Sequence, residues 1–158
     1  MTVMNKFIRG FVYVFSAVIM LSAVIPAYGV RYSKITGAVE LGYTKQDVMK
    51  KMGKPDSPQR FDFFYIRDKS EVIVCFDENT KTAEAVIIRG AEPNYSIEGI
   101  KVGDLKTSVK KAFGAPERIV NYKKSGVECW YYPSKNVNFA FTKDKISSFS
   151  ISDVNVGK

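Results

Sequence analysis

The feature that most constrains the fold of this chain is a sequence pattern that occurs twice, 61 residues apart. The first copy, from Leu41, reads LGYTKQDVMKKMGKP, and the second, from Val102, reads VGDLKTSVKKAFGAP. The identical residues at matching positions include Gly42 with Gly103, Val48 with Val109, Gly53 with Gly114 and Pro55 with Pro116. A pattern repeated at a fixed offset predicts a structural unit used twice. We place the two units at residues 30–90 and 91–158.

Each copy of the pattern predicts one short helix. Thr44 is a good N-cap, and Asp47 three residues later completes a capping box. In the second copy Leu105 replaces the threonine, so we expect Asp104 to cap the helix one position earlier. The glycine near the end of each copy suits a left-handed position after the helix, and the proline that follows prevents the helix from continuing.

Runs of β-branched and aromatic residues, separated by polar turns, predict the strands. The predicted strands are 61–66, 71–76 and 83–88 in the first unit, and 127–132, 136–141 and 146–151 in the second. We therefore predict an α+β fold of two tandem units. Each unit has one or two short helices packed on a three- to four-stranded antiparallel sheet. Because units of this size bury little apolar surface, we expect them to join edge to edge or to pack into one body.

The strands indicate that one face of each sheet is buried and the other faces outward, because apolar and polar residues alternate in the second unit. In the first unit the outward face is less polar, since Ile73, Cys75 and Ile87 lie on it. Such a face suits a contact surface for a partner, or a surface on which the two units pack together. The sequence leaves both arrangements open.

The N-terminus has the layout of an export signal. Lys6 and Arg9 form a positive region, an uncharged apolar run follows over 11–25, and small residues at Ala27 and Gly29 suit a signal peptidase. We predict a signal peptide over residues 1–29, cleaved after Gly29. The alternative is an uncleaved anchor, although a spanning helix needs about 20 apolar residues. The protein is then secreted or in the extracytoplasmic cell envelope, and it has no cysteine at the junction to make it a lipoprotein.

The composition narrows the functional classes. The chain has no histidine, which removes histidine-based acid–base catalysis and metal ligation. Two cysteines, Cys75 and Cys129, form either a disulfide or two isolated, half-buried thiols. The net charge of +8 comes from scattered lysines, which attract an anionic polymer or an acidic protein surface. Export argues against a nucleic acid, and we predict no cofactor, no metal and no enzymatic activity.

The repeated pattern resembles the BamE (SmpA/OmlA) envelope proteins and the β-lactamase inhibitor protein fold. Their shared piece is Gly-x-Thr-x-x-x-Val, then Gly-x-Pro after one helix, then a strand rich in Trp and Tyr. Matching residues are Gly42, Thr44, Val48, Gly53 and Pro55 in the first copy, and Gly103, Val109, Gly114, Pro116, Trp130, Tyr131 and Tyr132 in the second. The resemblance implies helices over a curved antiparallel sheet and a role in binding another protein.

The sequence therefore favours a non-catalytic, exported protein-binding module. The predicted contact residues are Tyr65, Trp130 and Tyr132, because Tyr and Trp are enriched at binding hot spots. The alternative for these strands places Tyr65 and Trp130 in the core, with Phe64, Ile66 and Tyr131 facing outward. The alternative function is a cell-wall-associated module that binds an anionic polymer through its lysines. A membrane is a partner only if the signal is uncleaved.

Overall fold

The computed structural model describes residues 31–91 and 93–153. The predicted signal peptide and its cleavage site after Gly29 lie outside the described residues. None of the described helices is long and apolar enough to cross a membrane.

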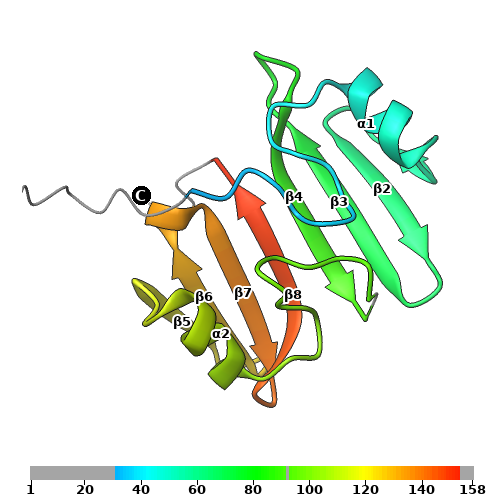
Figure 1. Ribbon diagram of the computed structural model, residues 1–158. Coiled ribbons are helices and arrows are strands. Elements are labelled where there is room, and N and C mark those ends of the chain that lie inside the picture. The colour runs from blue at the N-terminus through cyan, green and yellow to red at the C-terminus, as the bar shows by residue number, and fades with distance from the viewer. Residues whose placement is uncertain (1–30, 92, 154–158) are drawn as a thin grey trace, which may run out of the picture.

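The described residues form two α-helices, one 3-10 turn and eight strands (Figure 1). In chain order they are α1 (Lys45–Met52), β1 (Ser57–Pro58), β2 (Asp62–Arg67), β3 (Ser70–Phe76), β4 (Ala83–Gly90), α2 (Lys106–Phe113), β5 (Arg118–Tyr122), β6 (Val127–Tyr132), η1 (Pro133–Lys135), β7 (Val137–Thr142) and β8 (Lys145–Ser152). The six predicted strands correspond to β2, β3, β4, β6, β7 and β8, each within two residues at its ends. The strands β1 and β5 were not predicted.

The helix α1 begins as predicted. The Thr44 hydroxyl accepts a hydrogen bond of 3.2 Å from the Asp47 amide, and the Asp47 carboxylate accepts one of 3.0 Å from the Thr44 amide. This reciprocal pair is the predicted capping box, which satisfies two amides that a helix start otherwise leaves without a partner. Gly53 ends the helix with a φ of 84°, a value that disfavours any residue with a side chain.

The start of α2 differs from the prediction. Leu105 occupies the N-cap position and its side chain supplies no hydrogen bond. Asp104 does not cap the helix, because its carboxylate instead accepts a hydrogen bond of 2.9 Å from the Lys101 amide in the preceding turn. The helix ends at Gly114, whose φ of 82° matches that of Gly53. At both glycines ψ is extended, so neither takes the left-handed helical conformation that was predicted.

All eight strands belong to one antiparallel sheet in the order β1-β2-β3-β4-β8-β7-β6-β5. Each half of the chain contributes a meander of four strands, and the last strands of the two halves, β4 and β8, pair in the middle. The halves are therefore joined edge to edge, which is one of the two arrangements expected. In Figure 1, α1 lies beside β2, and α2 lies beside β5 and β6 at the other end of the sheet.

The predicted α+β class of two tandem units, each with its own small sheet, is wrong. Helix is confined to two eight-residue segments and one short turn in the described ranges, and a single eight-stranded sheet makes the protein mainly β. The physical reason is the pairing of β4 with β8. It sets Val86 against Ile151 and Ile88 against Phe149, so buried rows continue from one half into the other. A strand that ended either half would otherwise be an open edge.

The core lies between the sheet and the helices, on what we call the helix face. One row of paired residues on this face is buried across six strands. It consists of Tyr65, Val72, Ile88, Phe149, Phe139 and Trp130. Phe113 of α2 packs on this layer, with its ring centroid 5.0 Å from that of Phe139. Ile35, Val39 and Ile97, from the segments that precede α1 and α2, complete the cover. Burial of each such side chain is worth about 1.5–3 kcal/mol.

Candidate functional site

The candidate site is the opposite face of the sheet, which we call the open face. The helices and connecting segments of the described ranges lie on the helix face (Figure 1). One row of paired residues on the open face crosses all eight strands. The row consists of Ser57, Phe64, Ile73, Ile87, Ser150, Asn138, Tyr131 and Arg118. Along each strand these residues alternate with those of the helix face, because successive side chains of a strand point to opposite faces. Within the row only Ile73, at 6% exposed, is buried.

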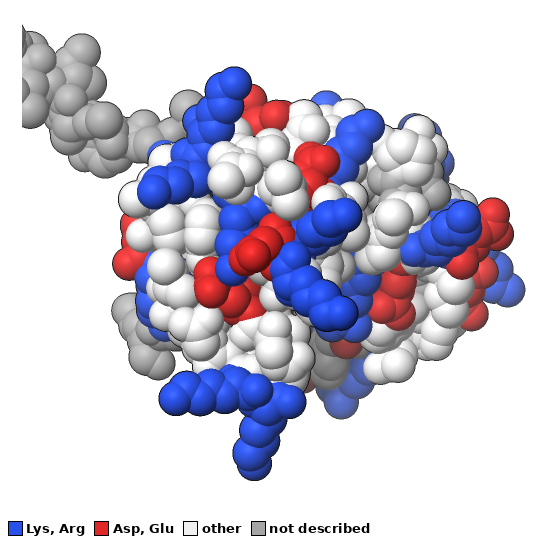
Figure 2. Space-filling view, turned by 90° about the horizontal axis from the view of Figure 1, so that it is seen from below, with Lys and Arg blue, Asp and Glu red and all other residues white. Residues whose placement is uncertain are grey.

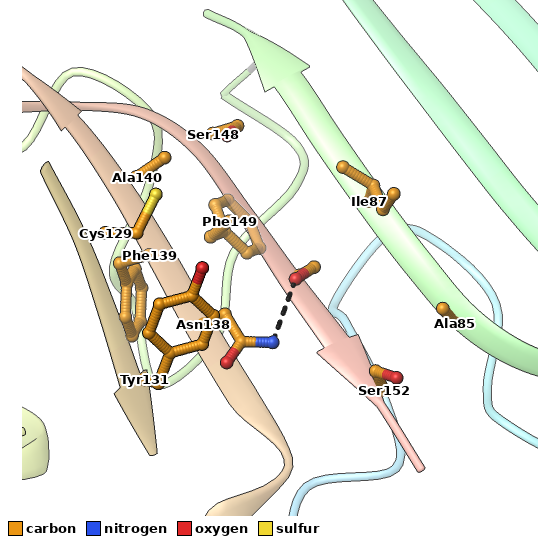
Figure 3. A pocket seen from close by; sticks show the side chains of 11 residues that line it. Ala85, Ile87, Cys129, Tyr131, Asn138, Phe139, Ala140, Ser148, Phe149 and Ser152 are labelled. Carbon is orange, nitrogen blue, oxygen red and sulfur yellow. Dashed lines mark hydrogen bonds between the residues drawn. The ribbon is translucent and has the colours of Figure 1, made fainter. Parts of the chain in front are cut away.

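The open face is hollowed over β4, β8, β7 and β6 by a groove of about 270 Å³. Its lining is largely of small side chains, among them Ala85, Ala140, Ser148, Ser150 and Ser152. The larger side chains Ile87 and Tyr131 come from the strands that border the groove, β4 and β6 (Figure 3). Small residues between larger ones leave room for a side chain of a partner.

The polar side chains in the groove carry hydroxyl groups and one amide. The Asn138 side-chain amide donates a long hydrogen bond of 3.5 Å to the Ser150 hydroxyl, drawn as the dashed line in Figure 3. The two residues pair across the neighbouring strands β7 and β8. Together with the hydroxyl groups of Ser148, Ser152 and Tyr131, they offer the hydrogen-bonding groups that can orient a bound chain.

Charged residues flank the apolar row of the open face. At one end the Arg118 guanidinium lies 4.3 Å from the ring centroid of Tyr131, a cation–π contact that holds both side chains flat. Nearer the middle, Arg89 forms an ion pair of 3.3 Å with Glu71 across β3 and β4. An apolar centre with a charged rim is the usual composition of a protein-binding surface.

Both cysteines lie on the open face as free thiols. Cys75 is on β3 and Cys129 is on β6, four strand steps apart, which is about 19 Å at the usual spacing. A disulfide needs Cα atoms within about 7 Å, so the thiols are isolated, the second of the two alternatives. Burial, followed by a hydrogen bond with Asp62, raises the pKa of Cys75 to about 12. Burial also raises the pKa of Cys129. Both thiols are therefore protonated and unreactive at neutral pH.

The predicted contact residues lie in the core. Tyr65, Trp130 and Tyr132 are 0%, 8% and 1% exposed, and all three are on the helix face. They do not form an exposed contact surface, because each ring is buried and its polar atom is held by a part-buried hydrogen bond. The Tyr65 hydroxyl donates to the Gly53 carbonyl, the Tyr132 hydroxyl donates to the Gly114 carbonyl, and the Trp130 indole donates to the Glu128 carboxylate.

The alternative prediction for these strands is confirmed. Phe64 and Tyr131 are half-buried on the open face, and Ile66 is 60% exposed there. Sequence reasoning did not find the groove itself. The signal was present in β8, where Ser148, Ser150 and Ser152 alternate with buried residues, but only the pairing of β4 with β8 shows that they line a hollow.

The described residues contain no group of three or more Asp, Glu, Cys or His side chains that could hold a metal ion. The chemistry that the open face offers is non-covalent contact: apolar surface, one stacked aromatic ring, and hydroxyl and amide groups.

Comparison with solved structures shows the fold alone. A cysteine-rich secretory protein from Staphylococcus aureus aligns with a TM-score of 0.53 and 12% identity, over 80% of this chain and 48% of that protein. An extracellular protein from Bacillus anthracis that contains an SCP domain aligns with a TM-score of 0.50 and 11% identity, over 72% of this chain and 44% of that protein. This chain therefore spans less than half of either protein.

A DUF4309 family protein from Bacillus subtilis aligns over 69% of this chain with 12% identity, but its TM-score of 0.49 is too low to support an argument. No protein-family model and no curated protein matches the sequence. These structural neighbours differ from the BamE and inhibitor proteins that the sequence motifs resemble, so that resemblance stays a prediction.

Proposed function

We propose that this chain is a non-catalytic, extracytoplasmic protein-binding module that holds another protein on the open face of its sheet. One observation carries the proposal: the open face is continuous across the sheet and has an apolar middle, and the helices of the described ranges all pack on the other side.

The apolar middle is the strongest support for a protein partner. Phe64, Ile73 and Ile87 are cross-strand neighbours on β2, β3 and β4, and the groove continues the patch toward Tyr131. Phe64 and Ile87 are half-buried, and Ile73 between them is 6% exposed. A contiguous apolar patch with a polar rim marks an interaction site, because leaving such a surface in water is unfavourable. A tyrosine at its edge supplies a large, rigid contact area.

The way the two halves join supports an external partner. If the halves packed face to face, each would cover the apolar residues of the other. Instead they are joined edge to edge through β4 and β8, which leaves one open face across both halves. Of the two uses predicted for an outward apolar face, a contact surface is thus the one that we propose.

The predicted export signal supports an extracytoplasmic location. The solved structures with TM-scores of at least 0.5 are described as an extracellular protein and a secretory protein, which agrees with that location. The anionic-polymer alternative has less support, because the face seen in Figure 2 intersperses Lys and Arg with Asp and Glu. Ion pairs such as Lys34–Glu40 and Arg67–Asp56 neutralise part of the charge.

Site-specific photo-crosslinking tests the proposal. A benzophenone amino acid replaces Ile87 on the open face or, as the matched control, Leu105, which is 49% exposed at the start of α2. Each purified protein is incubated with the envelope and culture fluid of its own cells and irradiated. We expect a discrete protein adduct from position 87, and none of that mass from position 105.

A competition experiment tests whether the adduct depends on the open face. An excess of the unmodified protein should abolish the adduct, whereas an excess of an Ile87→Ser, Tyr131→Ala variant should leave it. Ile87 pairs with Ser150 on the same face, so the Ile87→Ser substitution places a serine beside another serine of this face. Equal adducts from both positions, or an adduct that the double variant competes away, would show that the open face is not the contact surface.

A further inference from the structure

The two edges of the sheet are unequal. One edge is β1, which has two residues and ends in Pro58, a residue without an amide hydrogen. The other edge is β5, which has five residues and no proline. Short strands and prolines are the devices that protect a sheet edge from pairing with another chain. The β1 edge has both of them, and the β5 edge has neither.

The β5 edge is accessible in the described part of the chain. β5 is the last strand in the sheet order and pairs with β6 on one side only. Its side chains protrude on both faces: Ile119 on the helix face is 48% exposed, and Tyr122 on the open face is 50% exposed. An edge strand presents backbone N–H and C=O groups outward, which is a template for one more strand.

The surroundings of β5 are basic. The chain has no acidic residue from Arg118 to Val127, and Lys123 and Lys124 are exposed in the turn that follows β5. The next acidic residue, Glu128, lies on the helix face in an ion pair of 3.2 Å with Lys106. A hollow of about 330 Å³ lies at this end of the strand. Lys106, Lys123 and Lys143 line it together with Glu128 and Asp144, both of which form ion pairs with Lys106.

We propose that β5 binds an extended, acidic segment of a partner protein as an added ninth strand. The backbone hydrogen bonds of such β-augmentation give affinity for any extended chain, and the side chains on alternate positions select it. Carboxylates of the segment meet the positive potential of Arg118, Lys123 and Lys124, and an apolar residue packs on Ile119. This surface adjoins the groove of the open face at Arg118, which stacks on Tyr131, but its backbone template is the β5 edge and not the groove.

Charge also distinguishes this partner from a second copy of the chain. Two β5 strands paired antiparallel about a two-fold axis would bring Arg118 of one copy toward the Tyr122–Lys123 end of the other. Like charges across an antiparallel pair are destabilising, so the basic edge disfavours self-association. It favours a segment whose charges are opposite.

A peptide selection on the purified full-length protein tests the inference. A phage library of random twelve-residue peptides is panned at low ionic strength, and the enriched sequences are synthesised. We expect the enriched peptides to be rich in Asp and Glu and to lack proline. Within each peptide, acidic and apolar residues should alternate. On binding, amide hydrogen exchange should slow at Ile119–Tyr122.

Charge reversal supplies the matched control. Lys123→Glu, Lys124→Glu should weaken binding of the selected acidic peptides by about tenfold or more, because both charges lie beside β5. Lys50→Glu, Lys51→Glu on α1 makes the same change in net charge at the far end of the sheet and should leave binding within about twofold. All four lysines are exposed, and circular dichroism of each variant verifies the fold before binding is compared.

Three results would overturn the inference: no enriched acidic peptide, equal loss of binding in the two variants, or slowed exchange in β4 and β8 in place of β5. The last of these would support the open face as the binding surface, so the two proposals fail separately.

Discussion

The Tyr65 hydroxyl donates a hydrogen bond of 3.1 Å to the carbonyl oxygen of Gly53, the residue at which α1 ends. Tyr132 repeats the arrangement with Gly114 at the end of α2, at 3.0 Å. In both places a tyrosine of the sheet satisfies a carbonyl that a helix end leaves without a partner. The bond therefore fixes each helix to the sheet.

The first prediction concerns this bond. Tyr65→Phe should lower the free energy of unfolding by about 1 kcal/mol, because it removes a part-buried hydrogen bond between the sheet and the end of α1. Urea unfolding followed by circular dichroism measures the change. Tyr43→Phe is the control, since no hydrogen bond of the Tyr43 hydroxyl is seen in the described residues, and its effect should be within about 0.5 kcal/mol.

Tyr65→Phe also separates the core role from a contact role. A buried tyrosine contributes to stability, so the variant should form the same crosslinked adduct as the parent protein at temperatures where both are folded. Loss of the adduct with unchanged stability would contradict the placement of Tyr65 in the core.

The second prediction concerns the missing cap of α2. Leu105 stands at the N-cap with no side-chain hydrogen bond, whereas Thr44 caps α1. Leu105→Thr should raise the free energy of unfolding by about 1 kcal/mol, because the hydroxyl can accept from an amide of the first turn. Leu105→Ala, which adds no cap, separates this gain from the loss of the exposed leucine. Thermal unfolding of the two variants side by side gives the comparison, and an equal melting temperature would rule out the cap.

Much of the secondary structure could be predicted because local chemistry specifies it. The glycine and proline after each helix act within a few residues. The alternation of Val137, Phe139 and Phe141 with Asn138 and Ala140 defines a half-buried strand without reference to the rest of the fold. β5 escaped prediction because its apolar residues Ile119 and Val120 are adjacent and lie on opposite faces, so the sequence shows no alternation of apolar and polar residues.

The pairing of β4 with β8 could not be predicted, because any two alternating strands are compatible until the whole sheet is assembled. Which side chains of β2 face outward could not be predicted from the sequence for a related reason. Phe64, Tyr65 and Ile66 are consecutive apolar residues, so period two alone does not show which of them points inward. In the structure, Tyr65 points inward, and its hydrogen bond with Gly53 at the end of α1 holds it there. That contact joins residues of different elements, so the sequence of β2 alone does not show it.

The third prediction concerns the glycine at the end of β4. Gly90 has a φ of 76°, and a Cβ there would collide with the backbone carbonyl of Lys69. Gly90→Ala should cost at least about 3 kcal/mol, since backbone strain and overlap add. Gly126→Ala is the matched control: its φ is 66° but no atom lies near its Cβ, so we expect only the strain of about 1–2 kcal/mol. If Gly90→Ala and Gly126→Ala lost the same stability, the backbone at Lys69 would have to move away from the new Cβ at no cost.

The fourth prediction concerns the thiols. Burial and Asp62 raise the pKa of Cys75 from 9.0 to about 12, so its thiolate fraction at pH 8 falls on the order of 1000-fold. Alkylation by iodoacetamide at pH 8 should therefore be slowed by that order relative to the unfolded chain, and mass spectrometry of tryptic peptides reads each site separately. Cys129 is the internal comparison: burial also raises its pKa, and it should react faster than Cys75.

The same shift predicts a pH dependence of stability. Because the folded state raises the pKa of Cys75, the neutral thiol is favoured on folding. Its contribution is complete below pH 9 and is lost as the pH rises toward 12. Cys75→Ala removes this titration, so the stability gap between parent and variant should narrow from pH 9 upward. Unfolding in urea at pH 8, 9 and 10 measures the gap. A gap that widens with pH would mean that the folded state favours the thiolate, and the buried position of Cys75 beside Asp62 would then be wrong.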